Sequence, residues 1–513
     1  MRDYRRRFHE FHVKMQNNQH LIRLIDPEAP KPLGIKPRGS GRAGFGRVCC
    51  HPRRFPIQTS PLMTSPPANS IPHPTFSQRL RQWIVANPFL FVGVIYLLGN
   101  GLQLVFSRSD TSEWDQVFVR AARQLIDKGD IYSVPVVTST RPSPELFQLL
   151  HPFTYPPFQA IIAIPFTFLP HLLSRMGWFL VQVLALTTLW KLSWKITGGR
   201  PLNGGRWTPA EAAICVLGLI AGMRYVQGAF GHQQSDILID AFLVAGCFAW
   251  QRGRDFVAAS AWGVAAAFKG PPLLLAPYLA WRGRWAAAAW TIVLAIALNL
   301  VPDAIHRAPH GIWLTQWYTR IVKPTSGDVG AWYVDVTINQ SIAGAAHRFF
   351  TTGWSIANGK LDISYNKSIL PPKVLKLLVY ALEFVLVMTA AWGMGRPFRR
   401  PPDAYSAGLE SALVIILMLL LSPMSHKTHF GILILPGFFV ARMAIEHRDR
   451  VAAWCMLACV IVIGLLDHFF LYTALGDIFA WYGNVMWGAI ALGIACFYSL
   501  AVKSSSSSNQ QPV

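Results

Sequence analysis

Long apolar segments recur along the chain from residue 88 onward, and they constrain the fold more than any other feature. A helix needs about 20 mainly apolar residues to cross a bilayer, and fewer where neighbouring helices shelter it. The expected spans are residues 88–106, 173–195, 209–227, 234–250, 254–269, 271–282, 285–302, 370–394, 409–422, 429–444, 451–471 and 480–502. We expect the short segment 155–170, with prolines near both ends, to be re-entrant or interfacial. The pattern predicts an all-α polytopic membrane protein, a bundle of about 11–13 transmembrane helices with two large outer loops.

Basic residues fall on one side of the membrane if the twelve spans alternate in direction. They occupy the N-terminal tail and every second connector, at Arg79, Arg81, Lys191, Lys195, Arg200, Arg206, Arg252, Arg254, Arg282, Arg284, Arg396, Arg399, Arg400, Arg442, Arg448, Arg450 and Lys503. The positive-inside rule places this side, and both termini, in the cytoplasm. Two long loops, residues 107–154 and 303–369, then face outward, and long loops without a fold of their own are usually functional.

Composition agrees with a membrane protein and excludes several other classes. The chain is 52% hydrophobic and only 14% charged, whereas soluble domains carry about 25% charged residues. The net charge of +22 is spread over the tail and connectors. Because no recognised nucleic-acid module accompanies it, nucleic acid is not an expected partner. The seven cysteines have no metal-ligand spacing, so we expect no metal, no other cofactor and no disulfide framework.

The composition also divides the chain into three parts. Residues 1–87 are rich in Arg, Pro, Ser and Gly, which predicts a basic disordered tail. Met63, close before the first apolar segment, is an alternative start of translation, and the choice between the two starts stays open. Residues 88–502 form the transmembrane domain, and residues 503–513 form a second disordered tail.

Polar residues collect where the expected spans meet the outer face. Ionisable groups in or beside membrane segments are costly, so by default they mark a functional site. The candidates are Asp115, Tyr155, His232, Gln233, Gln234, Lys269, Asn339, Gln340, His426, Lys427 and His429. Because His426 and His429 lack a third ligand at useful spacing, we do not expect a metal site there.

Several of these residues allow two interpretations. Asp115 begins an amphipathic helix with Val119, Ala122 and Ile126 on one stripe, so it is either a helix-terminus charge or a general base. Lys269, before Gly-Pro-Pro, either extends to the interface or holds a phosphate. The turn from His232 to Gln234 is either solvated or binds sugar hydroxyls.

Aromatic residues of the second outer loop have a similar ambiguity. They are Trp313, Trp317, Tyr318, Trp332 and Tyr333. Such residues form belts at membrane interfaces, and they also stack on sugar rings. Both interpretations stay open.

The order of these motifs resembles glycosyltransferase family 87, a group of GT-C type membrane enzymes that includes polyprenyl-phosphate-mannose-dependent mannosyltransferases. The resemblance covers about residues 88–500 and begins with an acidic residue in the first outer loop. The later pieces are Gly129–Tyr132, Tyr155–Pro157, a Gln-containing turn, Lys269–Pro271, Asn339–Ser341 and Ser422–Ser425. The turn reads His232-Gln233-Gln234-Ser235 instead of Gly-Gln-x-Asn, and the histidine register after Ser425 is uncertain by one residue.

The resemblance implies a GT-C-like bundle that transfers a mannose-like hexose with inversion. The donor would be a polyprenyl-phosphate sugar, and the acceptor a hydroxyl of a glycolipid or glycan on the outer face of the plasma membrane, towards the periplasm or exterior. It implies that Asp115 is the catalytic base, with Asp110 and Glu113 as competitors. It also places Lys269 and His429 near the donor phosphate.

Three other functions are compatible with a polytopic chain. A transporter or lipid flippase would also use broken helices and polar residues at depth, but we find no internal repeat. An accessory membrane subunit would leave the polar motifs on one face unexplained. A polysaccharide ligase or polymerase would use the same class of donor.

Overall fold

The computed structural model describes most of the chain beyond the N-terminal tail. The described residues are 75, 77–78, 88–106, 112–133, 152–200, 207–325, 331–334, 336–352, 355–357, 360–362, 367–466 and 474–508. The chain divides into two units, Met1–His73 and Pro74–Val513, and the fold described below belongs to the second. The expected tail up to residue 73, the alternative start at Met63 and the competing acid Asp110 lie outside the described residues.

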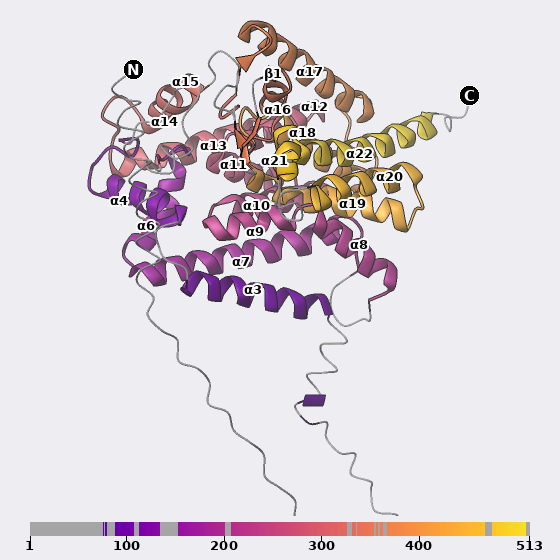
Figure 1. Cartoon of the computed structure of the whole chain (residues 1–513), viewed down its shortest axis with the longest axis horizontal. Helices are drawn as coiled ribbons and strands as arrows, with labels where there is room; N and C mark the ends of the chain where they lie inside the picture. Colours follow the sequence, from indigo (N-terminus) through magenta and orange to yellow (C-terminus); the bar gives the residue numbers. More distant parts are fainter. Residues whose placement is uncertain are drawn as a thin grey trace, which may run out of the picture. The chain divides into compact units, whose positions relative to one another are not determined.

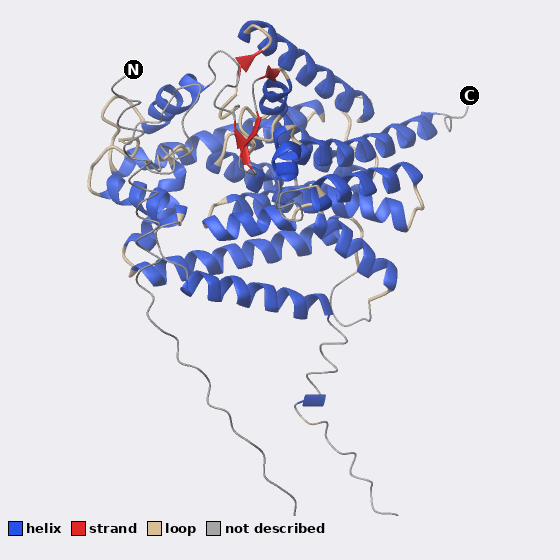
Figure 2. Cartoon of the chain, in the orientation of Figure 1, coloured by secondary structure: helices blue, strands red, loops and turns tan. Residues whose placement is uncertain are grey.

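The described chain is almost entirely helical (Figure 2). The helices that correspond to expected spans are α3 (Pro88–Phe106), α7 (His171–Ile196), α8 (Pro209–Ile220), α9 (Met223–His232), α10 (Asp236–Gln251), α11 (Asp255–Phe268), α12 (Leu275–Trp281), α13 (Trp285–Ile305), α17 (Pro372–Gly393), α18 (Ala404–Leu421), α19 (Ile434–Ile445), α20 (Arg450–Cys459) and α22 (Asn484–Ser508). Most begin and end within a few residues of the prediction, because Gly, Pro and charged residues interrupt the apolar runs there. α22 continues to Ser508, into the segment expected to be a tail.

Shorter elements fill the connections. The helical ones are η2 (Trp114–Val119), α4 (Arg120–Ile126), α6 (Phe158–Thr167), η3 (Pro271–Leu274), α14 (Trp313–Trp317), η4 (Tyr318–Val322), α15 (Lys323–Thr325), α16 (Ile342–Phe349), η5 (Lys427–Leu433), η6 (Val460–Leu465) and α21 (Ala474–Trp481). Two antiparallel pairs join β1 (Thr351–Thr352) to β4 (Lys367–Ser368) and β2 (Ser355–Ala357) to β3 (Lys360–Asp362).

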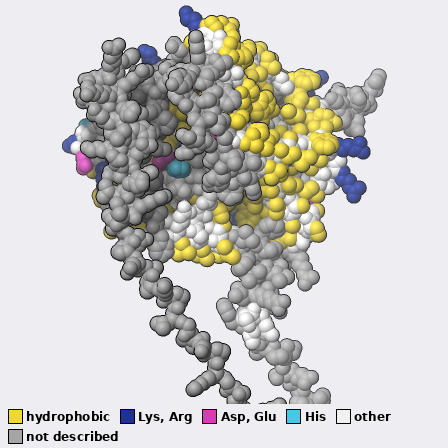
Figure 3. All heavy atoms as spheres, viewed as in Figure 1, with side chains coloured by type: hydrophobic (Ala, Val, Ile, Leu, Met, Phe, Trp, Pro, Cys, Tyr) yellow, Lys and Arg dark blue, Asp and Glu magenta, His cyan; other side chains and the backbone are white. Residues whose placement is uncertain are grey.

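Within the described ranges, six helices are long and apolar enough to cross a membrane, or seven if the bent pair α8 and α9 forms one span. The predicted all-α polytopic membrane protein is therefore confirmed. Shorter apolar helices such as α11 account for the larger number of spans in the prediction. On the face seen in Figure 3, hydrophobic side chains form a broad band with Lys and Arg near its margins.

The helices differ in how much neighbouring protein covers them. Only 17% of the apolar stretch of α17 is buried, whereas 83% of that of α18 is buried. α17 therefore lies at the rim, and α18 with α19 lies in the core. Figure 1 shows α3, α7 and α10 side by side, with α19, α20 and α22 beyond them.

The bend between α8 and α9 measures 49° and has a steric cause. Gly222, where α9 begins, packs against η5. A Cβ at this position would lie 2.5 Å from the carbonyl oxygen of Gly431. Only a residue without a side chain allows this approach, which brings the start of α9 close to η5.

The connectors with basic residues meet at one end of the bundle. The Arg282 guanidinium donates to Glu410 and to the carbonyls of Met394, Arg396 and Arg399. α10 ends at this end of the bundle, and α11 begins there. The opposite ends of α10 and α11 therefore meet at the other end, together with the outer loops. This arrangement agrees with the predicted separation of basic connectors from polar motifs.

The segment 155–170 does not cross the bundle. Its helix α6 has ten residues, or about 15 Å at 1.5 Å per residue. Gln159 near its start donates to the carbonyl of Phe268 at the end of α11. α7, which follows, begins next to η2, where Trp114 donates to Ser174 at 3.1 Å. Both ends of α6 thus lie at the same end of the bundle, as expected for a re-entrant segment.

Arg282→Leu is expected to destabilise the fold strongly. The side chains of Arg282 and Glu410 are 3% and 2% exposed, so the variant leaves a buried carboxyl without its partner. Removing one partner of a buried ion pair costs about 3–5 kcal/mol. Arg400→Leu is the matched control, because Arg400 is 39% exposed where it pairs with Asp255 and exposed pairs contribute about 0–1 kcal/mol. Equal midpoints of thermal unfolding for the two variants in detergent would contradict the expectation that Arg282→Leu is the more destabilising change.

Candidate active site

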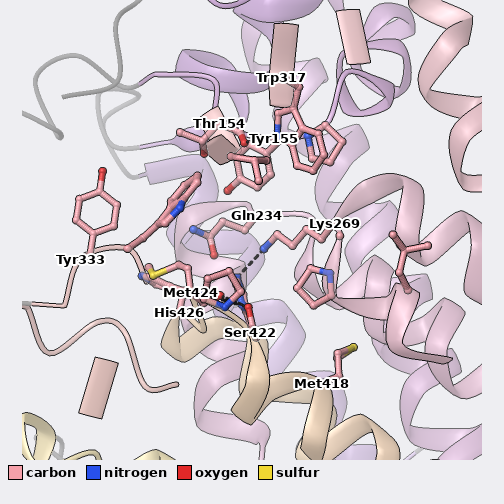
Figure 4. Close-up of a pocket in the computed structure, with 18 of the residues that line it drawn as sticks. Thr154, Tyr155, Gln234, Lys269, Trp317, Tyr333, Met418, Ser422, Met424 and His426 are labelled. Carbon is pink, nitrogen blue, oxygen red and sulfur yellow. Dashed lines mark hydrogen bonds between the residues drawn. The ribbon is translucent and has the colours of Figure 1, made fainter. Parts of the chain in front are cut away.

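A cavity of about 1090 Å³ opens at the end of the bundle opposite the basic connectors. Its polar lining comes from five separate parts of the chain, some of which Figure 4 shows around one space. These side chains are Glu113, Tyr155, His232, Gln234, Lys269, His426 and His429. Six of the eleven predicted site residues therefore lie together here, although hundreds of residues separate some of them in sequence.

Glu113 is the carboxylate of this cavity, and it lies at the start of η2. Nε2 of Gln234 donates to both of its oxygens, at 2.8 and 3.0 Å. The Tyr155 hydroxyl lies 3.5 Å from Oε2, and Nδ1 of His232 lies 3.9 Å from Oε1. Burial raises the pKa of Glu113 above its ordinary value of 4.5, partly offset by the hydrogen bond from Gln234. A carboxyl with a raised pKa is suited to accept a proton near neutral pH.

Lys269 supplies the cation, and the local sequence explains its position. α11 ends at Phe268, Lys269 itself is extended, and Pro271 and Pro272 follow. A residue close before proline is disfavoured in helix, so the chain turns at Lys269 and the side chain enters the cavity. Its Nζ donates to Asp236 and to Nε2 of His429, the latter at 2.8 Å (Figure 4). Nζ also lies 5.4 Å from the centre of the Tyr155 ring.

His426 presents a neutral imidazole to the same space. It caps η5, and its Nδ1 accepts a hydrogen bond from the Thr428 backbone N–H at 3.3 Å. The same nitrogen also lies 2.9 Å from the Thr428 hydroxyl oxygen. Burial lowers the pKa of His426 to about 4, so the ring is uncharged at neutral pH. His426 therefore offers an uncharged polar ring rather than a positive charge.

Apart from Thr154 and Ser422, the rest of the lining is apolar or aromatic. Apolar side chains come from η3, α12 and α18, and include Leu273, Leu274, Pro277, Met418 and Leu421. Trp317, Trp332 and Tyr333 of the second outer loop complete the lining, and Figure 4 shows Trp317 and Tyr333 at different parts of the rim. Of the five predicted aromatic residues, Trp313 is instead fully buried and Tyr318 is exposed. The cavity thus combines an apolar wall with a polar end.

Asp115 does not line this cavity. Its Oδ2 lies 2.8 Å from Nε2 of His171 and 3.9 Å from Nε of Arg175, both at the start of α7. Residues two apart in a helix point to opposite sides. Glu113 and Asp115 therefore diverge, and the predicted competitor Glu113 faces the cavity.

The apolar stripe predicted for the amphipathic helix after Asp115 is only partly buried. Val119 and Ala122 are buried, but Ile126 is 37% exposed. η2 and α4 pack against α6, and η2 also packs against α7, with Trp114 stacked on Trp178.

Four other predicted residues also lie outside the lining: Gln233, Asn339, Gln340 and Lys427. Gln233 ends α9 in the left-handed conformation, and its Oε1 accepts from Ser112 at 2.6 Å. Asn339 Nδ2 donates to the carbonyls of Trp332 and Pro423, while its Oδ1 accepts from the Ser425 N–H. The side chains of Gln233, Asn339 and Gln340 are buried and hold the loops of the site against one another, whereas Lys427 is half-buried.

Asp236 was missed as a site residue by the sequence analysis. It is the first residue of α10, and both of its oxygens contact groups of the site, Lys269 and Thr428. The signal was present in the turn GHQQSD, because an acid that directly precedes an apolar span is costly unless it is paired. Within the described ranges no group of three His, Cys, Asp or Glu side chains is placed to hold a metal ion.

Comparison with known proteins relates this site to one enzyme family. The model of glycosyltransferase family 87 matches residues 153–423, just over half of the chain. A polyprenol-phosphate-mannose-dependent alpha-(1-2)-phosphatidylinositol pentamannoside mannosyltransferase from Mycobacterium tuberculosis (strain CDC 1551 / Oshkosh) is 27% identical over 237 residues. That alignment covers 45% of this chain and 49% of the relative, so the chain spans about half the length of the curated relative it matches.

Among solved structures, ArnT from Cupriavidus metallidurans bound to undecaprenyl phosphate aligns with a TM-score of 0.33 and 14% sequence identity. The alignment covers 82% of this chain and 79% of that chain.

Proposed function

Because the chain belongs to glycosyltransferase family 87, as the order of its motifs predicts, we propose that it transfers a mannose-like hexose from a polyprenyl-phosphate sugar to an acceptor hydroxyl. The curated relative depends on polyprenol-phosphate-mannose, which supports this donor. One observation carries the proposal: the cavity places a half-buried carboxyl and a lysine ammonium next to the same residue, Tyr155, beside an apolar wall.

The lysine side of the cavity is proposed to bind the donor phosphate. Lys269 Nζ has three N–H groups and makes two contacts, which leaves one N–H for a ligand. The ring of His426, in the same lining, is proposed as a second donor. The apolar residues of η3, α12 and α18 are suited to the polyprenyl chain. When the bond from the anomeric carbon to the phosphate oxygen breaks, its electron pair leaves with the phosphate, and these donors stabilise the added charge.

The carboxyl side is proposed to activate the acceptor. Glu113 takes the proton of the acceptor hydroxyl as that oxygen attacks the anomeric carbon. Attack opposite the leaving phosphate inverts the configuration of that carbon. Asp115, which the resemblance first implied as the base, is the alternative, and its pairing with His171 makes it less available.

The site is proposed to face the outer side of the plasma membrane, towards the periplasm or exterior. The basic connectors gather at the end of the bundle opposite the cavity, and such residues favour the cytoplasmic side. A cysteine placed at His232, at the cavity, should therefore react with a membrane-impermeant maleimide in intact cells. One placed at exposed Arg399 should not.

The proposed function is tested with purified protein in lipid vesicles. Polyprenyl-phosphate mannose and the corresponding glucose and arabinose donors are each offered with a panel of glycolipid acceptors, including a mannosylated phosphatidylinositol. Product formation from one donor, with the anomeric configuration opposite to that of the donor, would support the proposal. Movement of the lipid donor across the bilayer without transfer to any acceptor would contradict it and favour a flippase.

The pH dependence of transfer should reveal the buried carboxyl. If Glu113 must be ionised to act, kcat/KM falls as the pH drops through the pKa of the free enzyme's base. Because burial raises that pKa, the acid limb is expected above pH 4.5, the ordinary pKa of a glutamate. Steady-state rates between about pH 4.5 and pH 8 measure this limb. A profile that stays flat down to pH 4.5 would exclude a base with a raised pKa.

A further inference from the structure

Asp236 is a buried carboxylate directly behind the lysine of the cavity, but it does not itself line that cavity. Its side chain is 3% exposed, and that of Lys269 is 14% exposed. Oδ1 accepts from Lys269 Nζ, and Oδ2 accepts from the Thr428 hydroxyl at 2.8 Å. Asp236 therefore joins the start of α10 to the end of α11 and to η5. It contacts the site through Lys269, and it lines a small neighbouring cavity of about 20 Å³ rather than the main one.

Several other titratable groups surround Lys269, and none replaces Asp236 as its counter-ion. They are Glu113, Tyr155, His232, Asp240, His426 and His429. Among the described carboxylates, Asp236 is the one in hydrogen-bond contact with Nζ. His429 accepts from Nζ through Nε2, so it acts there as an uncharged partner. Asp240, one helical turn deeper on α10, makes no described contact with Nζ.

Resting on the proposed phosphate role of Lys269, we propose that Asp236 is a positioning residue that keeps Lys269 in its ammonium form and directs it into the cavity. A buried ammonium without a counter-ion favours the neutral amine, because burial disfavours the charged form. Lys269 has few other sources of compensation, since His426 and His429 are uncharged partners. With Asp236 in place, two N–H groups are fixed and the third points to a ligand.

The proposal predicts a pH dependence that appears only when Asp236 loses its charge. Asp236→Asn keeps the size of the side chain and an oxygen that accepts from Thr428, but removes the negative charge. Affinity for polyprenyl-phosphate mannose should then fall as the pH rises, by up to about tenfold per pH unit. Replacing Lys269 by Arg in the same variant should abolish that slope, because a guanidinium stays charged.

The experiment measures the dissociation constant of polyprenyl-phosphate mannose, without acceptor, between about pH 7 and pH 9 in nanodiscs. All proteins carry Glu113→Gln, which prevents turnover and removes the other carboxyl of the cavity. The dissociation constant of this parent should not change with pH. That of Asp236→Asn should rise with pH, and that of Asp236→Asn with Lys269→Arg should again not change. Asp240→Asn is the matched control, because it makes the same substitution one helical turn away. Its dissociation constant should not change with pH.

Two outcomes would overturn the inference. One is a flat profile for Asp236→Asn, and the other is a slope that persists after Lys269→Arg. If Asp236 had only a structural role, Asp236→Asn would lower the affinity for the donor equally at every pH. Adding Lys269→Arg would then not change the pH dependence. If the parent protein does not bind the donor at any pH, the proposed function fails instead, so the two failures are distinguishable.

Discussion

Glu113→Gln is expected to lower the rate of sugar transfer by about 10²–10⁴-fold, the usual contribution of a general base. The amide keeps the size of the side chain and still accepts a hydrogen bond from Gln234, whose Nε2 lies 2.8 Å from Oε1 of Glu113. It cannot accept the proton of an acceptor hydroxyl. The donor should still bind, so the loss should appear in kcat rather than in the donor KM.

Asp115→Asn is the control for this experiment. Asp115 lies only two residues away, but its Oδ2 contacts His171 and Arg175 rather than the cavity. Its loss should disturb the contact between η2 and α7 and lower the rate by much less than the loss of Glu113. The proposal for Glu113 fails if Asp115→Asn is the inactive variant and Glu113→Gln retains transfer. Melting temperatures of both variants separate lost chemistry from lost folding.

The choice between these two acids shows what the sequence alone does not determine. Both acids stand before an amphipathic helix, and the apolar pattern identifies the helix without showing which side of its first turn faces a cavity. In the structure Trp114, between them, stacks on Trp178 with ring centres 3.9 Å apart. This contact rotates Glu113 towards Gln234 and Asp115 towards α7. It joins residues that are 64 positions apart, so local periodicity carries no trace of it.

The transmembrane helices were predictable because hydropathy and helix breakers act locally. The break after α11 follows from Gly270-Pro271-Pro272, which stops a helix wherever it occurs. The same break places Lys269 in the cavity, so this site residue followed from local sequence as well. The bend at Gly222 was not predictable, because its cause is a close approach to Gly431.

Asn339 and Gln340 illustrate the opposite case, in which a polar motif holds the backbone of buried loops in place. Gln340 Nε2 donates to the Ala480 carbonyl at 3.0 Å, and its Oε1 accepts from the Val485 N–H. Amide side chains of this kind satisfy backbone groups that a buried loop leaves unpaired. A motif that matches the family therefore positions the loops around the cavity, and its side chains do not line the cavity themselves.

Lys269→Met is the second variant with a large expected effect. Without the ammonium, the leaving phosphate loses a donor, and such a loss typically costs about 10²–10³-fold in rate. The same change leaves the Asp236 carboxylate buried without its counter-ion, which costs about 3–5 kcal/mol of folding free energy. Activity and stability should therefore fall together in the single variant, and that result alone would not separate the two causes.

The double variant Lys269→Met with Asp236→Asn separates them. Removing both charges relieves the unpaired carboxylate, so the midpoint of thermal unfolding should return most of the way to that of the native protein. Transfer should stay low, because the lost donor to the phosphate has not been replaced. A double variant that recovers both stability and transfer would show that Lys269 contributes to folding and not to the reaction. Stability restored without transfer would assign Lys269 to the donor phosphate.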